Sequence, residues 1–331
     1  MQAFSIGGYG QALQLTETSE PTVGDHDVLI DVRAASVNQL DIKIAEGEFK
    51  SLMSFDFPLT LGHDTAGTVI GAGSKVTRFA AGDRVFGRPR DGRIGTFAER
   101  IAVHENDLAL VPTASTWEDA ASLPLVALTA WQALVDVGKV QPGQRVLIHA
   151  GAGGVGSIAI QIAKHLGATV ATTASARNEE LVRSLGADIV IDYRSQDFES
   201  ELSDYDFVLD GVGGESLQKS LRVLRPGGRA VGIAGPPTPE FARSIGANVI
   251  VKTAIAALSA KVRRQARKLD VNYDFLWMRA SGQQLEQIAT LVDRGVIRPL
   301  VGEVFSFDNT PAAVAALAAG GRAGKVVVRR E

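Results

Sequence analysis

The sequence contains no cysteine, and this absence excludes disulfide bonds and thiolate metal sites. It also lacks any run of about 18 uncharged apolar residues, the length that a membrane-spanning helix requires. The N-terminal segment MQAFSIGGYGQALQL lacks the basic start and apolar core of a signal peptide. A large charge of one sign is missing too, because the formal net charge of the 331 residues is −3. We therefore expect a cytoplasmic protein that binds neither nucleic acid nor membrane.

A basic run from Lys261 to Asp270 is a local exception to this balance. Such a run is compatible with an RNA-binding or membrane-binding patch. Because the rest of the chain is acidic on balance, a solvated helix face is the interpretation that we prefer.

Short apolar segments and glycines are abundant, and they form two patterns. Up to about residue 110, β-rich segments alternate with glycine and proline, which is typical of a compact, barrel-like β domain. After Gly138, short apolar runs alternate with helical stretches, and this alternation predicts a doubly wound parallel sheet whose sixth strand is YDFLWM. The last segment is too short for a domain of its own, so we expect it to complete the first one. The predicted parts are residues 1–122, 123–279 and 280–331.

A glycine-rich turn, GAGGVG, follows the first apolar run of the second pattern and opens a predicted helix. Its glycines have the spacing of a dinucleotide-binding turn. Gly151 permits the tight turn, Gly153 lets the backbone approach a pyrophosphate, and Gly156 lets helix and strand pack closely. Backbone N–H groups at the helix start, at Gly154 and Val155, attract the anion. An ordinary glycine-rich turn is the alternative.

The segment about 20 residues further on selects the dinucleotide, because an NAD site uses a carboxylate there to bind the ribose 2′-hydroxyl. This chain has TTASARN instead. A carboxylate about 4 Å from a 2′-phosphate costs up to about 4 kcal/mol at an effective dielectric constant of 20. Ser175 and Arg177 avoid that penalty and supply donors to a phosphate, so we predict NADPH as the cofactor. For Arg177, a surface residue at a helix start is the alternative.

Five segments carry a resemblance to a known family: residues 35–43, 57–87, 120–134, 150–156 and 324–328. On these segments the chain resembles the medium-chain dehydrogenase/reductase superfamily, and within it the zinc-free quinone oxidoreductase branch. It is most similar to the alkenal/one oxidoreductases and the chloroplast-envelope quinone reductases. The resemblance implies a doubly wound parallel Rossmann sheet inserted into a GroES-like β-barrel catalytic domain. It also implies a homodimer that forms through the sixth strand of the sheet.

The segment LGHDTAG sets His63 beside a carboxylate, as many metal ligands are presented. In zinc alcohol dehydrogenases of this superfamily, the position matching Asn38 is a cysteine ligand and the position matching His63 is a second ligand. An amide is a poor zinc donor, and a catalytic zinc site needs about three protein ligands. The four-cysteine lobe for structural zinc is also missing. We therefore predict no metal, and we interpret the histidines as structural, pocket-lining or solvent-facing residues: His26, His63, His104, His149 and His165.

Without zinc, simple alcohol oxidation is disfavoured because no Lewis acid stabilises an alkoxide. Hydride transfer from NADPH to a quinone, or to the C=C bond of an α,β-unsaturated carbonyl compound, needs only hydrogen-bond donors and a proton. The predicted function is therefore a zinc-independent, NADPH-dependent oxidoreductase that acts on such a small-molecule substrate. Two alternatives stay open: a non-catalytic, crystallin-like NADPH-binding protein that contacts RNA through the basic run, and a metal-dependent alcohol dehydrogenase.

The resemblance also implies roles for individual residues outside the glycine turn. Asn38 would bind the substrate oxygen or the nicotinamide amide, Asp41 would orient its neighbours, and Thr129 would lie near the nicotinamide. A turn-forming Asn, a helix-capping Asp and a helix-interior Thr are the alternatives. The other implied cofactor contacts are Lys43, Tyr193, Gly211, Val212, Gly232, Ile233, Leu276 and Lys325. The loop at residues 44–57 is expected to shape access of the substrate.

Overall fold

The computed structural model describes residues 1–50, 53 and 55–331. These residues form two compact units: unit 1 contains residues 1–128 and 279–331, and unit 2 contains residues 129–278. Three positions of the predicted substrate-access loop, 51, 52 and 54, lie outside the described residues. Among the described residues, none of the helices combines the length and the apolar character needed to cross a bilayer.

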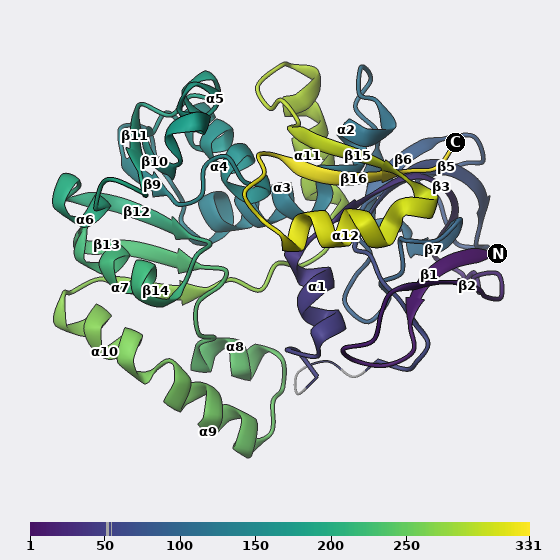
Figure 1. The fold of residues 1–331 in the computed structure, drawn as a ribbon, viewed down its shortest axis with the longest axis horizontal. Coiled ribbons are helices and arrows are strands. Elements are labelled where there is room, and N and C mark those ends of the chain that lie inside the picture. The colour runs from purple at the N-terminus through teal and green to yellow at the C-terminus, as the bar shows by residue number, and fades with distance from the viewer. Residues whose placement is uncertain (51–52, 54) are drawn as a thin grey trace. The chain divides into compact units, whose positions relative to one another are not determined.

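Unit 1 is built on β-sheets (Figure 1). Its larger sheet has the strand order β15-β16-β3-β5-β6-β8, with β7 paired to β3, and a smaller sheet has the order β2-β1-β4. The strands are β1 (Gln2–Ile6), β2 (Gln14–Glu17), β3 (Asp27–Val37), β4 (Leu59–Thr60), β5 (Asp64–Ala72), β6 (Arg84–Gly87), β7 (Arg100–His104), β8 (Leu108–Leu110), β15 (Val301–Ser306) and β16 (Lys325–Arg329). The helices are α1 (Gln39–Glu46), α2 (Trp117–Ala121), α11 (Gly282–Asp293), α12 (Thr310–Ala318) and the first part of α3 (Pro124–Trp131).

The long strand β3 organises unit 1 because it pairs with β5, β7 and β16. Its apolar side chains, among them Val28, Ile30 and Val32, are buried in the core with Val326 and Val328 of β16. The pairing of β16 with β3 is antiparallel, so the last strand of the chain lies beside a strand formed about 290 residues earlier. The C-terminal segment is thereby part of unit 1.

Unit 2 contains one parallel sheet with the order β11-β10-β9-β12-β13-β14, and helices pack along it (Figure 1). The strands are β9 (Arg145–Ile148), β10 (Thr169–Ala174), β11 (Ile189–Asp192), β12 (Tyr205–Asp210), β13 (Leu224–Gly232) and β14 (Asn272–Phe275). The helices are α4 (Gly154–His165), α5 (Glu179–Ser184), α6 (Phe198–Glu201), α7 (Gly214–Arg222), α8 (Pro239–Ser244), α9 (Val249–Leu258) and α10 (Ala260–Lys268). The strand order reverses between β9 and β12, and parallel sheets of this kind bind ligands at such a switch point.

This architecture confirms the predicted fold class, a doubly wound parallel sheet joined to a β domain. The sixth strand lies at residues 272–275, slightly before the predicted 273–278. Helices α8 and α9 were not expected from the sequence. Helix α9 begins with Val249-Ile250-Val251, a β-branched run that resembles a strand when only local propensity is considered. Its N-cap Asn248, which accepts a hydrogen bond from Val251 N–H, is the signal that marks a helix start.

Candidate functional site

The glycine turn of unit 2 joins β9 to α4. Gly153 is the N-cap of α4, so Gly154, Val155 and Gly156 form the first turn of this helix. A Cβ atom on Gly151 would lie 2.1 Å from Thr172 Oγ1, and one on Gly156 would lie 2.2 Å from the carbonyl oxygen of Ala150. Packing therefore requires glycine at both positions.

Gly153 differs from the other two glycines of this turn. A Cβ atom there would meet only the Ala150 carbonyl oxygen, at 3.2 Å, so the space beside Gly153 is largely open. The N-terminus of the twelve-residue helix α4 lies at this open side. Unpaired backbone N–H groups and the helix dipole favour an anion at such a place, and the turn therefore fits a phosphate group.

Ser175, Arg177 and Tyr193 lie at neighbouring strand ends. Ser175 directly follows β10 and is buried, whereas Arg177 is exposed in the short 3₁₀ turn Ala176–Asn178. Tyr193 directly follows β11 and is 58% exposed. Because β10 and β11 are adjacent and parallel, the segments that carry these three side chains leave the same edge of the sheet. A hydroxyl, a guanidinium and a phenol can all donate hydrogen bonds to a phosphate.

A chain of buried hydrogen bonds starts at the glycine turn. The backbone N–H of Ala150 donates to Thr173 Oγ1 over 3.1 Å, and Thr173 Oγ1 lies 3.2 Å from His149 Nδ1. His149 Nε2 lies 2.9 Å from Ser220 Oγ. Ser220 Oγ in turn lies 3.2 Å from Asp210 Oδ2. The turn after β9 is thereby connected with the carboxyl end of β12.

Asp210 organises the loop that follows β12. It is fully buried, and its Oδ1 atom accepts hydrogen bonds from Val212 N–H and Gly213 N–H, at 2.9 and 2.6 Å. The Asp210 carbonyl oxygen accepts from Ile233 N–H, and the Gly232 carbonyl oxygen accepts from the N–H of Leu276, which directly follows β14. The predicted cofactor contacts at these strand ends are Gly211, Val212, Gly232, Ile233 and Leu276. All of them follow or end β12, β13 and β14 at the edge of the sheet where such folds bind ligands.

The burial of His149 is expected to make the stability of the protein depend on pH. Burial lowers the pKa of His149 below its ordinary value of 6.5, and the nearby Asp210 carboxylate opposes this shift. Between pH 6.5 and the folded-state pKa the unfolded chain binds more protons, so stability is lost as the pH falls through this window. We expect the urea midpoint to fall from pH 7 to pH 5 and this fall to be smaller in His149→Gln. The exposed His165 serves as control, and a His165→Gln variant that flattens the profile equally would contradict this assignment.

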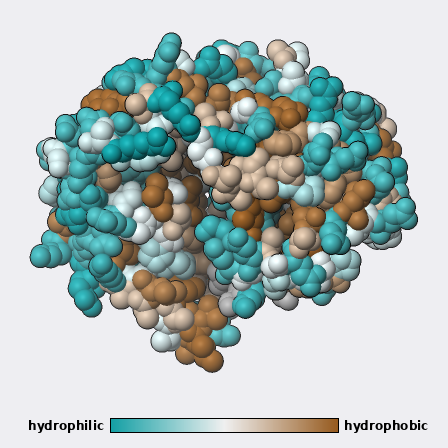
Figure 2. Space-filling view, viewed as in Figure 1, coloured by the Kyte–Doolittle hydropathy of each residue, from teal (hydrophilic) through white to brown (hydrophobic). Residues whose placement is uncertain are grey.

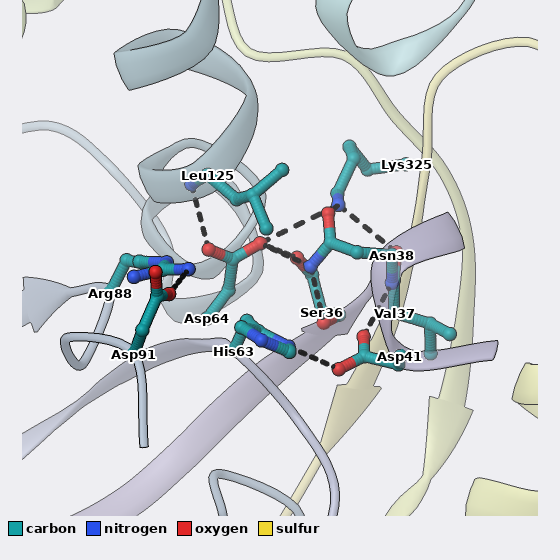
Figure 3. Close-up of polar contacts among 10 residues, drawn as sticks. All are labelled: Ser36, Val37, Asn38, Asp41, His63, Asp64, Arg88, Asp91, Leu125 and Lys325. Carbon is teal, nitrogen blue, oxygen red and sulfur yellow. Dashed lines mark hydrogen bonds and ion pairs between the residues drawn. The ribbon is translucent and has the colours of Figure 1, made fainter. Parts of the chain in front are cut away.

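Unit 1 contains a buried polar cluster (Figure 3). We call it the β3–β5 cluster, and it consists of Ser36, Asn38, Asp41, His63, Asp64 and Lys325. The Asp64 carboxylate accepts from Ser36 Oγ at 2.7 Å, from Asn38 Nδ2 at 2.8 Å and from Leu125 N–H at 2.7 Å. Lys325 Nζ lies 3.5 Å from the same carboxylate. The side chains of Asp64 and Lys325 are 0% and 7% exposed, so this ion pair is shielded from solvent.

The amide of Asn38 is fully engaged within this cluster. Lys325 Nζ donates to Asn38 Oδ1 and, at 3.0 Å, to the Val37 carbonyl oxygen. Asn38 Nδ2 donates to Asp64 and to the Ser36 carbonyl oxygen. The predicted role of Asn38 as a direct donor to substrate would require one of these bonds to break. Its geometry instead suits a residue that holds the segment between β3 and α1.

Asp41 and His63 form the second part of the cluster. Asp41 Oδ2 accepts from the backbone N–H of Asn38, the residue that caps α1, over 2.8 Å. Asp41 Oδ1 lies 2.6 Å from His63 Nδ1, and because a carboxylate only accepts, this ring nitrogen carries the proton. Asp41 thus holds both the helix start and the imidazole, and its role in catalysis stays a prediction.

The donor set of the β3–β5 cluster does not fit a catalytic zinc ion. The Lys325 ammonium already lies beside Asp64 and would repel a divalent cation, and the Asn38 amide oxygen faces this ammonium. Within the part of the chain that the structure describes, no three side chains of His, Asp or Glu are grouped as metal ligands.

Three further predicted site residues lie in unit 1 or at its boundary. Lys43 of α1 is partly exposed, and its Nζ pairs with Glu48 at 3.1 Å. Thr129 is buried within α3. Lys325, predicted as a cofactor contact, is instead seen in the β3–β5 cluster.

Sequence reasoning missed the parts played by Asp64, Asp210 and His149. Each of the two carboxylates stands next to an apolar strand or within one, in LGHDTAG and in FVLDGVG. A charged residue in such a run must find buried partners, and this was the available signal. His149 ends the apolar run RVLIH, so its burial was predictable although its partners were not.

Comparison with known proteins supports the architecture. Residues 24–113 match the alcohol dehydrogenase GroES-like domain, and residues 185–328 match the zinc-binding dehydrogenase family. An NAD(P)H oxidoreductase of Danio rerio, described as mitochondrial, is 34% identical over 99% of this chain and 91% of its own length. The chloroplastic NADPH-dependent alkenal/one oxidoreductase of Arabidopsis thaliana is 39% identical over 74% of this chain and 65% of its own length.

A solved structure has the same fold over nearly the whole chain. The quinone oxidoreductase of Coxiella burnetii has a TM-score of 0.85 and 31% identity, and the alignment covers 99% of both chains. The alignments with the Danio rerio and Coxiella burnetii proteins each cover 99% of this chain. The chain belongs to the medium-chain dehydrogenase/reductase superfamily.

Proposed function

We propose that this protein is a zinc-independent, NADPH-dependent oxidoreductase that reduces quinones or the C=C bond of α,β-unsaturated carbonyl compounds. The observation that carries the proposal is the open glycine turn at the start of α4, followed at the next strand end by Ser175 and Arg177 in place of a carboxylate. The names of the relatives, an NAD(P)H oxidoreductase, an NADPH-dependent alkenal/one oxidoreductase and a quinone oxidoreductase, support it.

The residues of unit 2 fit the proposed cofactor. The turn at Gly151, Gly153 and Gly156 would hold the pyrophosphate at the N-terminus of α4. Arg177 and Tyr193 would hold the 2′-phosphate, because their segments leave adjacent strand ends. When bound, NADPH supplies a hydride to an electron-poor acceptor.

The protein residues act mainly by positioning. The hydrogen bonds through His149, Ser220 and Asp210 keep the glycine turn and the loop after β12 in a defined relation, so both parts of the nucleotide site are set before binding. The β3–β5 cluster likewise holds part of residues 35–43, a segment that the family resemblance makes one wall of the nicotinamide pocket. Preorganised sites of this kind lower the cost of binding and orientation.

A panel of acceptors tests the proposal. We expect NADPH consumption with 2-alkenals, vinyl ketones or benzoquinones, much slower consumption with NADH, and no response to chelators. Simple alcohols should not be oxidised. NADPH binding without turnover on any acceptor would support the non-catalytic, crystallin-like alternative. Chelator-sensitive oxidation of alcohols would show a metal-dependent dehydrogenase instead.

We also propose a homodimer. Strand β14 ends the strand order of its sheet, and the pairing that the structure describes for it is with β13. Pairing of β14 with a second copy would extend the sheet and protect its edge. Sedimentation equilibrium should give the mass of a dimer, and a monomer at all concentrations would contradict this assembly.

A cytoplasmic location stays a prediction, because relatives are described as mitochondrial and as chloroplastic.

A further inference from the structure

Helix α9 presents an apolar stripe to solvent. The stripe consists of Val249, Ile250, Thr253, Ala254, Ala257 and Leu258, and we call it the α9 stripe. Val249, Ile250 and Leu258 are 77%, 80% and 67% exposed, the highest values among the large hydrophobic residues that are exposed. Figure 2 shows hydrophobic residues gathered at the bottom of the view, where Figure 1 places α9. Exposure of this much aliphatic surface is unfavourable in water unless something covers it.

The stripe is exposed because α9 contacts the rest of unit 2 by its opposite side. Ile255 is the buried residue of this helix. The six residues of the stripe follow the spacing i, i+1, i+4, i+5, i+8, i+9, so they share one face. Small side chains in the middle of the stripe, at Ala254 and Ala257, make this face smooth. None of its members is charged.

Helix α10 continues this face with positive charge. The path stays helical at the junction, where Ser259 N–H donates to the Ile255 carbonyl and the Ser259 carbonyl accepts from Arg263 N–H. Lys261, Arg264 and Lys268 follow Ala257 at helical spacing, and all three are exposed. Between residues 241 and 269 the chain has seven cations and no acid: Arg243, Lys252, Lys261, Arg263, Arg264, Arg267 and Lys268.

We propose that helices α9 and α10 form a peripheral surface that binds an anionic lipid bilayer. The α9 stripe would enter the boundary between headgroups and acyl chains, and the cations of α10 would lie among anionic headgroups. Helices with an apolar face beside a basic one bind membranes in this way, by buried apolar area and by attraction to anionic lipids. This surface revises the expectation of no membrane partner, which rested on net charge and on the absence of a spanning segment. The proposal does not depend on the reaction that the protein catalyses.

The charge of this surface argues against the other occupants. A second copy docked on the same face would bring two segments with seven cations each together, and like charges at an interface are unfavourable. An RNA strand would use the cations, but it would leave the aliphatic stripe uncovered, and this stripe offers no aromatic ring for base stacking. An anionic bilayer satisfies both the charge and the apolar area.

Co-sedimentation of the full chain with vesicles tests the proposal. We expect binding to vesicles of phosphatidylcholine with phosphatidylglycerol, weaker binding at high salt, and little binding to phosphatidylcholine alone. Two double variants, Val249→Ser with Ile250→Ser and Lys261→Gln with Arg264→Gln, should each lower the partition coefficient about tenfold or more. Because all four side chains lie at the surface, neither variant should change the thermal midpoint or NADPH consumption.

Matched changes elsewhere on the surface serve as controls. Leu15→Ser with Val304→Ser removes two apolar side chains that are each 47% exposed, and Lys50→Gln with Arg294→Gln removes two exposed cations. Both controls should bind vesicles like the unaltered protein. The proposal is overturned by absence of binding, by equal binding to both lipid mixtures, or by equal losses in the controls. It is also overturned if the α9 and α10 variants abolish self-association or binding of a single-stranded RNA while vesicle binding persists.

Discussion

Replacing Arg177 with aspartate is expected to reverse the preference of the protein for NADPH over NADH. Arg177 is exposed in the turn directly after β10, where the 2′-phosphate of a bound dinucleotide would lie. The change removes a cation and adds an anion, and the repulsion at about 4 Å costs roughly 4 kcal/mol at an effective dielectric constant of 20. The ratio of kcat/KM for NADPH to that for NADH should therefore fall by about 100-fold or more. Steady-state kinetics with both dinucleotides measure this ratio.

An arginine outside this turn provides the control for charge. Arg294→Asp alters an exposed cation of unit 1 in the same manner and should leave the ratio unchanged. If Arg177→Asp also leaves the ratio unchanged, another group recognises the phosphate, and Tyr193 would be the first to replace, by phenylalanine.

Replacing Lys325 with methionine is expected to lower the free energy of unfolding strongly. Burial lowers the pKa of Lys325, and the carboxylates of Asp64 and Asp41 oppose this effect. Methionine keeps much of the side-chain volume but leaves the buried Asp64 carboxylate without its cation and leaves Asn38 Oδ1 without this donor. Removal of one partner of a buried ion pair costs about 3–5 kcal/mol, so the free energy of unfolding should fall by this amount. Urea denaturation measures it.

A double variant separates the charge from the packing. In Lys325→Met with Asp64→Asn both members of the pair are neutral, so the double variant should recover part of the lost stability. The interaction energy of this double-mutant cycle gives the contribution of the pair. A single Lys325→Met variant that loses less than about 1 kcal/mol would show that the β3–β5 cluster tolerates an unpaired carboxylate.

The sequence was sufficient for features that depend on local spacing. The alternation of apolar runs and helical stretches predicted the parallel sheet of unit 2, because a parallel strand needs a crossover connection before its neighbour. The spacing of the three glycines predicted a tight turn at the start of a helix, and the structure leaves no room for a Cβ atom at Gly151 or Gly156. The absence of a carboxylate after β10 is visible in the sequence by itself. Each of these signals is built from short patterns of neighbouring residues, a strand followed by a helix or a single turn.

Contacts between distant segments were decided by the tertiary structure alone. Lys325 and Asn38 are 287 residues apart in the chain, and antiparallel pairing of β16 with β3 brings them together. His149 reaches Ser220 across 71 residues because β9 and β12 are neighbours in the sheet. Buried polar groups must find partners, but residue type does not specify which ones.

Exposure of the α9 stripe was likewise outside the reach of the sequence. The segment VIVKTAIAAL has the composition of a buried helix, and only the packing of Ile255 inward and of Val249 and Ile250 outward shows which face is left to solvent. The pattern of the sequence determined that the chain is an α/β protein with a glycine-rich turn at a helix start, and the absence of cysteine excluded thiol chemistry. The tertiary structure decided which charges are neutralised inside and which apolar surface stays outside, because both depend on neighbours that the chain supplies from far away.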